Sequence, residues 1–332
     1  MSGGIDSTAA ALLLQEQGYD LVGCTFRTRY TEEASLQSAA ALARQLGIEH
    51  HVVDYEQRFE QDIVAYFCNE YAAGRTPNPC VLCNRQIKFG VLLEEASRLG
   101  CDGLATGHYA RVKDGMLYRA KDERKDQTYF LWQVPQQALQ RVLFPLGDLT
   151  KDEVRAFLES KGLTDLAHKG ESQDICFIKD DYRTFLQAQD ASPLPLAEQG
   201  DYIDAEGKVL GRHEGYVNYT IGQRKGLGIA LGTPAFVTRI DAAHNRVTLG
   251  AHDDLYTHDV YLSHCVFHGD TSQTVLAQIR YRSKAQEAVL VNIDNNGVGL
   301  IRFAEPVWAV TPGQSCVMYQ DNKVVGGGII ES

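Results

Sequence analysis

The chain has 332 residues, of which 44% are hydrophobic and 23% charged, and its formal net charge is −11. This balance fits two or three globular domains and excludes disordered and collagen-like proteins. No apolar run approaches the ~20 residues of a membrane helix, and eight cysteines are too few for a disulfide scaffold. We therefore expect a soluble, cytoplasmic protein with no membrane partner.

The first half of the chain alternates helix and strand patterns. Glycine directly follows the helical patterns, as expected for a left-handed cap. Repeated units of this length predict an α/β fold with a doubly wound parallel sheet, which binds its ligands at the carboxyl ends of the strands. We expect helices over residues 7–17, 35–46, 59–73 and a segment ending at 99. We expect strands over 21–26 and 51–54, and a strand that runs into a loop over 103–108.

From about residue 255 onward, short alternating segments follow one another, separated by turns such as Asn296-Gly297 and Pro312-Gly313. This pattern predicts a small C-terminal antiparallel β-barrel, although a sandwich would give the same pattern. We expect a nucleotide-binding catalytic domain over 1–180, a small central domain over 181–252 and the β-barrel domain over 253–332.

The chain opens on a turn rich in glycine and serine, Ser2-Gly3-Gly4-Ile5-Asp6-Ser7. Two glycines let the backbone curl around an anion, and the helix that follows directs its free amide groups to the same place. Asp6 is suited to holding Mg²⁺. The alternative is an ordinary turn before a helix.

In a doubly wound sheet, the central first strand would deliver this loop, and the sequence contains no such strand before Ser2. We expect that the recorded start is internal to a longer natural chain. The alternative is a form that has lost nucleotide binding.

Two cysteines of one short motif, Cys80 and Cys83, lie in a loop rich in proline and asparagine that opens a helix, and Cys176 follows much later. Positive potential from Arg85 and Lys88 favours thiolate character, and two such thiols can pass sulfur by persulfide and disulfide exchange. A structural zinc site, which wants a fourth ligand, and unreactive buried cysteines are the alternatives. Two acidic residues near Cys176 could tune its pKa or cap a turn: Glu171 and Asp174.

Basic residues gather in two segments of this acidic chain. Residues 111–125 hold six basic and three acidic residues, and residues 271–285 hold three basic residues and no acidic one. Local patches of this kind are compatible with a structured RNA partner, and a solvated surface is the alternative.

Six motifs resemble, in the same order, those of the bacterial tRNA-specific 2-thiouridylase family, a group of pyrophosphate-loop ATP pyrophosphatases. They are the Ser2–Ser7 loop, NPCVLCNRQIKF, ATGHYAR, KDQTYFLW, GESQDICFI and GRHEGYVNYTIGQRKGLGI. The resemblance implies an enzyme that uses ATP to adenylate the C2 oxygen of the wobble uridine of tRNA and then replaces that oxygen with sulfur, forming 2-thiouridine. It also implies a sulfur-relay protein fed by a cysteine desulfurase as donor, and we expect a monomer.

The same resemblance implies site residues. Cys83 matches the catalytic nucleophile, Cys176 the carrier of the persulfide, and Asp6 belongs to the catalytic set through its Mg²⁺. Nucleotide-binding positions match Ser2, Gly3, Gly4, Ile5, Asp6, Ser7, Phe26 and Gly107. Positions against the target base or the tRNA match Asn78, Pro79, Cys80, Lys125, Asp126, Gln127, Arg280 and Tyr281.

Cys80 departs from the family pattern, because many members carry aspartate there. With Cys83 and Cys176 it could hold three irons of a [4Fe-4S] cluster, leaving the fourth iron free to bind sulfide. The persulfide relay is the first interpretation and the cluster the second. Two further alternatives are another pyrophosphate-loop synthetase, which leaves the cysteines without a purpose, and a non-catalytic tRNA-binding scaffold.

Overall fold

The computed structural model spans residues 1–332 and describes all of them except 171–174, 180, 190–197, 270–272 and 295. The described chain divides into two compact units. The first consists of Met1–Ile63, Cys80–Phe177 and Asp321–Val324, and the second of Val64–Pro79, Ile178–Gln320 and Val325–Ser332. Every helix in the described part is too short or too polar to span a bilayer.

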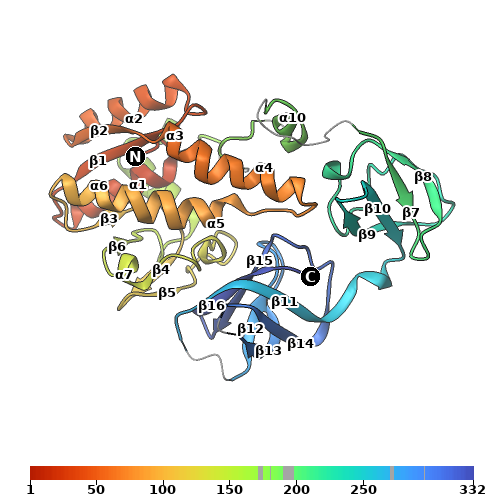
Figure 1. Ribbon diagram of the computed structural model, residues 1–332. Coiled ribbons are helices and arrows are strands. Elements are labelled where there is room, and N and C mark those ends of the chain that lie inside the picture. The colour runs from red at the N-terminus through yellow and green to blue at the C-terminus, as the bar shows by residue number, and fades with distance from the viewer. Residues whose placement is uncertain (171–174, 180, 190–197, 270–272, 295) are drawn as a thin grey trace. The chain divides into compact units, whose positions relative to one another are not determined.

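The elements of residues 1–177 alternate between helix and strand along most of their length (Figure 1). Two stretches, η1 and η2, are π-helical. In chain order the elements are α1 (Ile5–Glu16), β1 (Val22–Arg27), α2 (Glu33–Leu46), β2 (Glu49–Asp54), α3 (Glu56–Phe59), η1 (Glu60–Val64), α4 (Ala65–Ala72), α5 (Pro79–Cys83), η2 (Asn84–Val91), α6 (Leu92–Arg98), β3 (Leu104–Ala105), β4 (Arg111–Lys113), β5 (Met116–Tyr118), η3 (Thr128–Phe130), α7 (Gln136–Leu139), β6 (Val142–Leu143), α8 (Lys151–Ser160) and α9 (Thr164–Ala167).

Parallel strand pairs define the α/β unit. β1 runs parallel to β2, with α2 packed against both, and β3 runs parallel to β6. Strands joined through helices in this way are the βαβ arrangement that the sequence predicts, so the α/β class is confirmed. The expected strand that runs into a loop over 103–108 is confirmed: Leu104 and Ala105 pair with β6, and the rest is a loop that leads to the site described below.

Glycine ends the predicted helices as expected. A residue without a Cβ tolerates the positive φ needed to turn the chain out of a helix. Gly47, directly after α2, has a φ of 69° and donates its amide back to Arg44.

The first unit buries a cluster that joins α1 to α8. Ile5, Ala9 and Ala10 of α1 pack with Val154 and Leu158 of α8. Small residues on α1 allow the two helices to approach closely, and both helices begin beside the same loop. Met1 lies next to β1, since its amino group donates to the carbonyl of Cys24 and its own carbonyl accepts from Thr25.

Beyond residue 177 the chain is mostly strand. In chain order the elements are α10 (Tyr182–Gln187), β7 (Gly200–Ile203), β8 (Val209–His213), η4 (Tyr216–Asn218), β9 (Phe236–Asp241), β10 (Arg246–Gly250), η5 (Asp253–Leu255), β11 (Tyr256–Phe267), β12 (Val275–Gln278), β13 (Gln286–Ile293), β14 (Gly299–Trp308), β15 (Ser315–Gln320) and β16 (Lys323–Ile330). The small sheet of this region has the order β8-β7-β10-β9.

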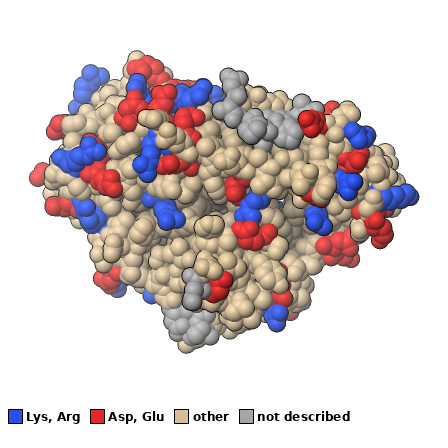
Figure 2. Space-filling view, viewed as in Figure 1, with Lys and Arg blue, Asp and Glu red and all other residues tan. Residues whose placement is uncertain are grey.

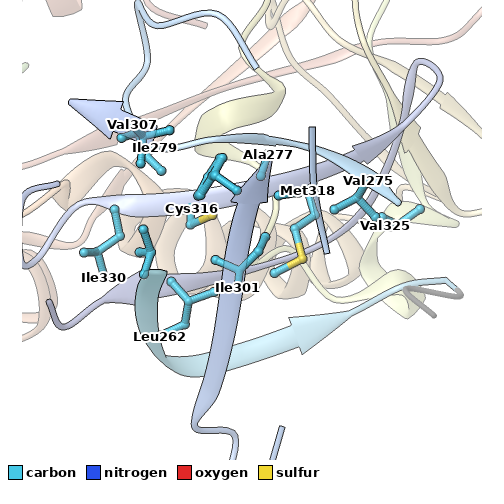
Figure 3. Packing of buried hydrophobic residues seen from close by; sticks show 13 residues of the cluster. Leu262, Val275, Ala277, Ile279, Ile301, Val307, Cys316, Met318, Val325 and Ile330 are labelled. Atoms are coloured by element: carbon cyan, nitrogen blue, oxygen red, sulfur yellow. The ribbon is translucent and has the colours of Figure 1, made fainter. Parts of the chain in front are cut away.

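The last six strands close into an antiparallel barrel. Their order is β11-β14-β13-β12-β15-β16, and β16 pairs back onto β11. Side chains such as Leu262, Ile301 and Met318 point into the barrel and exclude water from it (Figure 3). The strands fall on the six alternating segments of the sequence, so the predicted barrel is confirmed and the sandwich is excluded.

A corner of the barrel holds the segment that leads to the first cysteines. The Thr76 amide donates to the Pro312 carbonyl at 2.8 Å, and the Gln314 side chain donates to the Thr76 carbonyl at 2.8 Å. Gly313, with a φ of 89°, leaves no room for a side chain, because a Cβ there would lie 3.0 Å from the Thr76 carbonyl carbon. The start of the loop before Asn78 is therefore fixed within the second unit.

The barrel core gives a direct test of packing. Met318 is fully buried, so Met318→Ala should lower the free energy of unfolding by about 2–5 kcal/mol through the cavity it leaves. Val289, on the outer face of β13, is 42% exposed, and Val289→Ala is the matched control with an expected change within about 0.5 kcal/mol. Urea denaturation followed by tryptophan fluorescence measures both, and equal effects would contradict the inward orientation of Met318.

Candidate active site

The glycine-rich turn forms a compact loop at the start of α1. The Ser2 amide donates to the Ser7 hydroxyl at 3.2 Å, and the two serine hydroxyls lie 3.0 Å apart. Gly3 has a φ of 66°, and a Cβ there would lie 3.1 Å from the Ala39 amide nitrogen. Within the described chain no side chain caps α1, so its first amides face the loop and are free to bind an anion.

A second loop, Thr106–Tyr109, closes against the first. A Cβ on Gly107 would lie 2.7 Å from the carbonyl carbon of Asp6, so only glycine allows this approach. The Tyr109 hydroxyl donates to Asp6 Oδ1 at 3.0 Å. Gly107, a predicted nucleotide-binding residue, thus lies directly beside the glycine-rich loop. Phe26 lies half-buried near the end of β1.

Gly107→Ala should disrupt this contact. The added methyl group must displace backbone atoms of Asp6, and overpacking of this kind costs about 1–3 kcal/mol. If the loop binds the phosphates of ATP, affinity for ATP should fall about tenfold to a hundredfold. Gly170→Ala is the matched control, because a Cβ there meets no atom of the described residues within 4 Å. Calorimetric titration with MgATP measures both, and unchanged affinity in Gly107→Ala would place the nucleotide elsewhere.

The first cysteine motif lies where an α-helix changes into a π-helix. α5 ends at Cys83 and η2 continues without a break from Asn84. The i→i+5 hydrogen bonding of a π-helix widens the turn, so residues five apart share a face, and such turns are frequent at functional sites. Lys88 follows Cys83 by five residues and is half-buried, whereas Arg85 is exposed.

His108 holds Lys88 in place. Its ring Nε2 lies 3.4 Å from Lys88 Nζ and its Nδ1 lies 2.7 Å from the Thr106 hydroxyl. Burial, with the charge of Lys88 second, lowers the pKa of His108 well below its usual value, so the ring is neutral at pH 7. Because Nε2 faces an ammonium group it must accept, and the proton therefore resides on Nδ1.

Burial has the largest effect on the pKa values of Cys80, Cys83 and Cys176. Desolvation raises the pKa of Cys83 to about 12 and that of Cys80 to about 11, and Lys88 opposes the change in both. The Cys176 side chain is exposed to solvent. The protein around it nevertheless desolvates the thiol and raises its pKa, and Lys88 again opposes the change. Lys88 thus favours the thiolates as expected, Arg85 is not among the causes of the shifts, and burial has the larger effect. Lys88 is nonetheless the cation whose field acts on all three thiols.

The raised pKa values predict the pH dependence of alkylation. Cys83 should react slowly with iodoacetamide at pH 7, and its rate should rise about tenfold per pH unit up to pH 10 without a plateau, because its pKa of about 12 lies above that range. Lys88→Met should slow Cys83 by about threefold or more, since removing the cation disfavours the thiolate. Peptide mass spectrometry gives the rates.

Arg85→Met is the matched control, because the exposed Arg85 should leave the rate at Cys83 unchanged. A plateau below pH 9 for Cys83 in the unmodified protein would contradict its burial as the dominant effect.

A metal centre is not preformed. Among the residues that the structure describes, no three His, Cys, Asp or Glu side chains gather into a group that could hold a metal ion. Glu171 and Asp174, which could influence Cys176, lie outside the described residues. Asp6 has two contacts to Oδ1, from Tyr109 and from Lys151 Nζ at 2.7 Å, so Oδ2 is the oxygen that could take Mg²⁺.

In the predicted tRNA-contacting segment Lys125–Gln127, the side chains of Asp126 and Gln127 form hydrogen bonds within the protein. Asp126 is buried and accepts from the Ala120 amide and the Thr128 hydroxyl. Gln127 clamps Tyr109, since its Oε1 accepts from the Tyr109 amide and its own amide donates to the Tyr109 carbonyl. Gln127 thus supports the loop that carries Gly107, and Asp126 holds its own segment to Ala120.

Arg280 is likewise engaged. Its guanidinium donates to the carbonyls of Ile221 and Ala309 and to the Thr311 hydroxyl, and it lies 5.9 Å from the Trp308 ring centroid. These contacts link the barrel to the loop before β9 within the second unit. Tyr281 is half-exposed.

The predicted target-base residues are divided along the chain: Asn78 and Pro79 belong to the second unit and Cys80 to the first, and α5 begins at Pro79. Asn78 and Cys80 are half-buried and Pro79 is buried.

The basic segment 111–125 carries little free charge. Arg111 pairs with Asp148, Arg119 with Asp126, and Lys121 with Glu153 at 2.8 Å. On the face shown in Figure 2, basic and acidic residues are interspersed and form no continuous basic area. The sequence count of bases therefore overstates the positive potential here.

Sequence reasoning missed Tyr109 and Lys151 as partners of Asp6. Both lie more than a hundred residues from Asp6 along the chain, so no local spacing connects them. One signal for Lys151 was available, because lysine is unfavourable in the first turn of a helix and marks a position with another purpose.

Comparisons with known proteins cover the whole chain. Models of three families match: the tRNA methyl transferase HUP domain over residues 1–180, the tRNA methyl transferase PRC-barrel domain over 192–251, and the aminomethyltransferase beta-barrel domain over 257–330. The tRNA-specific 2-thiouridylase MnmA of Acidithiobacillus ferrooxidans is 44% identical over 344 residues, covering 100% of this chain and 97% of that protein.

Two further relatives agree. The tRNA-specific 2-thiouridylase MnmA of Syntrophotalea carbinolica is 46% identical, covering 99% of this chain and 97% of that protein. The tRNA-specific 2-thiouridylase MnmA 3 of Phocaeicola vulgatus is 45% identical, covering 100% and 93%. A solved structure of NMN synthetase from Francisella tularensis, at 18% identity and a TM-score of 0.35 over 52% of this chain and 64% of that one, is too distant to support an argument.

Proposed function

Because the chain belongs to the tRNA-specific 2-thiouridylase family, we propose that it catalyses ATP-dependent 2-thiolation of the wobble uridine of tRNA. One observation carries the proposal beyond the family match. Within the loop Thr106–Tyr109, Gly107 contacts the glycine-rich loop Ser2–Ser7, and His108 contacts Lys88 of η2. Activation by ATP and attack by sulfur thus take place on neighbouring elements of one unit.

ATP activates the base. The C2 oxygen of uridine attacks the α-phosphorus, the bond from that phosphorus to the β-phosphate oxygen breaks, and pyrophosphate leaves with the electron pair. The oxygen on C2 then departs as AMP, a far better leaving group than oxide. Ser2–Ser7 and the amides at the start of α1 bind the phosphates, and Phe26 and Gly107 line the nucleotide site. Asp6 would hold the Mg²⁺ that accompanies ATP, and the ion would offset phosphate charge.

Sulfur follows from a persulfide on Cys176. Its terminal sulfur attacks C2 and AMP leaves, which joins C2 to Cys176 through two sulfurs. Cys83 then attacks the inner sulfur, the sulfur–sulfur bond breaks toward the base, and a Cys83–Cys176 disulfide and 2-thiouridine remain. Burial of Cys83, which is 7% exposed, supports this order, because water at C2 would only regenerate uridine.

A [4Fe-4S] cluster on Cys80, Cys83 and Cys176 fits the structure less well. Those thiols form no metal-binding group among the described residues. The persulfide route needs Cys83 and Cys176 only. It also needs a persulfide donor, which we take to be a relay protein fed by a cysteine desulfurase, and a dithiol reductant to reopen the disulfide.

The tRNA must present its uridine out of the base stack. We assign the flipped base to Asn78, Pro79 and Cys80, around the start of α5, because they match the family's motif for that contact. Lys125 and Tyr281 remain candidates for direct contact with the tRNA, whereas Asp126, Gln127 and Arg280 act by holding the protein segments around them.

Cysteine variants test the reaction. Cys83→Ser and Cys176→Ser should abolish 2-thiouridine in tRNA incubated anaerobically with MgATP and a persulfide donor, as measured by nucleoside mass spectrometry. Pyrophosphate release should persist in both, because adenylation precedes sulfur transfer. Cys101→Ser, at a half-buried cysteine outside the motifs, is the matched control and should retain thiolation.

Cys80→Ala separates the two sulfur routes. The persulfide relay predicts retained thiolation, and Cys80→Asp, which restores the residue common in the family, should behave alike. Loss of thiolation in Cys80→Ala, together with a visible iron–sulfur absorption band in the reconstituted protein, would replace the relay by the cluster. Absence of thiolation with every donor, despite tRNA binding, would favour the non-catalytic scaffold.

A further inference from the structure

A long loop of the second unit, residues 219–235, joins η4 to β9 without a helix or strand of its own. Loops longer than about 12–15 residues without secondary structure are uncommon in compact domains unless they have a function. No acidic residue occurs from Gly215 to Ile240, although the whole chain has a net charge of −11. Its length and composition therefore make the 219–235 loop a candidate binding element.

Alternate side chains anchor the 219–235 loop to the core of the small sheet. Leu227 is buried in the cluster that covers this sheet, and Ile229 and Leu231 pack against the same cluster. The Tyr202 hydroxyl donates to the Leu227 carbonyl at 2.7 Å. The path of the backbone through this stretch is therefore fixed from the inner side.

The residues between these anchors are small and exposed: Gly226, Gly228, Ala230 and Gly232. The three glycines have φ values of 75°, 67° and 75°. A Cβ on Gly228 or Gly232 would meet no described atom within 4 Å, so packing inside the protein does not require their small size. The outer face of the loop is bare backbone, which a ligand can approach closely.

The amides of this backbone are available to a ligand. Within the parts of the chain that the structure describes, no amide of residues 224–235 donates a hydrogen bond to a protein acceptor. Successive amides in a backbone that turns through positive φ form concavities that bind anions. The loop lines a hollow of about 480 Å³ together with Arg224, and a hollow of this size admits a small ligand.

Two cations lie at the start of the anchored stretch. Arg224 and Lys225 are both exposed, and neither forms an ion pair with a described carboxylate. The Arg224 guanidinium lies 5.9 Å from the centroid of the Phe236 ring. An aromatic face attracts the cation and leaves its N–H donors free for a ligand. The loop therefore offers charged donors and backbone donors together.

This set of donors fits the backbone of a nucleic acid better than the surface of a protein. The loop exposes no large apolar side chain, and the core of a protein interface is built from such residues. Asp181 and Glu214 line an adjoining hollow that reaches Gly226, so an anion is expected on the Arg224 side of the loop. Arginine, lysine and backbone amides are common donors to nucleic-acid phosphates.

We propose that residues 224–232 bind the sugar–phosphate backbone of the tRNA. The proposal rests on the function proposed above and adds a tRNA-binding site to it. Arg224 and Lys225 pair with phosphate groups, and amides of the loop donate to phosphate oxygens. Contacts of this kind fix the position and orientation of a nucleic acid without reading its sequence.

The salt dependence of tRNA binding tests the two cations. The affinity for an unmodified tRNA transcript with uridine at the wobble position is measured by fluorescence anisotropy, without ATP or a sulfur donor, between about 50 and 200 mM KCl. Arg224→Gln/Lys225→Gln should bind about tenfold to a hundredfold more weakly at low salt. The slope of log affinity against log salt should become shallower by about one to two.

Lys208→Gln/Arg239→Gln is the matched control, because it removes two exposed cations of the same unit that lie outside the loop. This control should change neither the affinity nor the slope. Unchanged affinity and slope in Arg224→Gln/Lys225→Gln would overturn the proposal.

Ala230→Leu tests the close approach to the backbone without a change in charge. Ala230 is exposed and has no positive φ, so leucine should leave the melting temperature unchanged while its side chain covers the bare face. The affinity for tRNA should fall about tenfold. Ala205→Leu, at an exposed alanine in the turn before β8, is the matched control. Unchanged affinity in Ala230→Leu would overturn the proposal, because cations that act only at long range need no contact with the loop.

Other ligands and the proposed reaction give different results. Unchanged tRNA affinity with slower loading of Cys176 by the relay protein would assign the loop to that protein and overturn the proposal. Unchanged tRNA affinity with weaker MgATP binding in calorimetry would do so in favour of the nucleotide. Weaker tRNA binding by the loop variants of a protein that forms no 2-thiouridine would sustain the site and refute thiolation. Thiolation with unchanged tRNA affinity would do the reverse.

Discussion

The site depends on one close approach, that of the Gly107 backbone to Asp6. A Cβ on Gly107 would lie 2.7 Å from the Asp6 carbonyl carbon, so any other residue would push the two loops apart. Around this contact, Tyr109 reaches Asp6 and His108 reaches Lys88. Gly107, His108 and Tyr109 thus contact both the glycine-rich loop and Lys88 of η2. The Tyr109 amide also donates to the Gln127 side chain, so Gln127 adds support to the loop.

The fold was largely predictable from local patterns. Alternating apolar residues marked the six barrel strands because each strand has one face in the core, and Figure 3 shows that core. Glycines marked helix ends because only they adopt positive φ at little cost, as Gly47 does. The π-helix at Asn84–Val91 was predicted only as helix. Its extra residue per turn shifts the apolar periodicity too little over eight residues to be recognised.

The site was predictable where its residues are contiguous and not where they meet through the fold. Ser2–Ser7 form a loop because glycines and a helix start follow one another in the chain. Lys151 meets Asp6 across 145 residues, and only the packing of α1 on α8 brings them together. A charge count cannot reveal ion pairs for the same reason. The basic residues of 111–125 find acidic partners such as Asp148 and Glu153 that lie elsewhere in the sequence.

Burial and charge oppose each other at the cysteines, and the balance suits a reaction that water would spoil. A fully exposed thiolate would be reactive at all times and open to oxidation, whereas the buried Cys83 thiol holds its proton at neutral pH. Lys88 reduces the cost of ionisation without removing it. The wide turn of η2 brings that cation toward the face of Cys83, and the neutral His108 fixes it there. Ionisation of Cys83 then requires a partner that takes the proton or stabilises the thiolate. In the proposed reaction the sulfur on C2 takes that proton, because the electron pair of the sulfur–sulfur bond passes to it as the bond breaks.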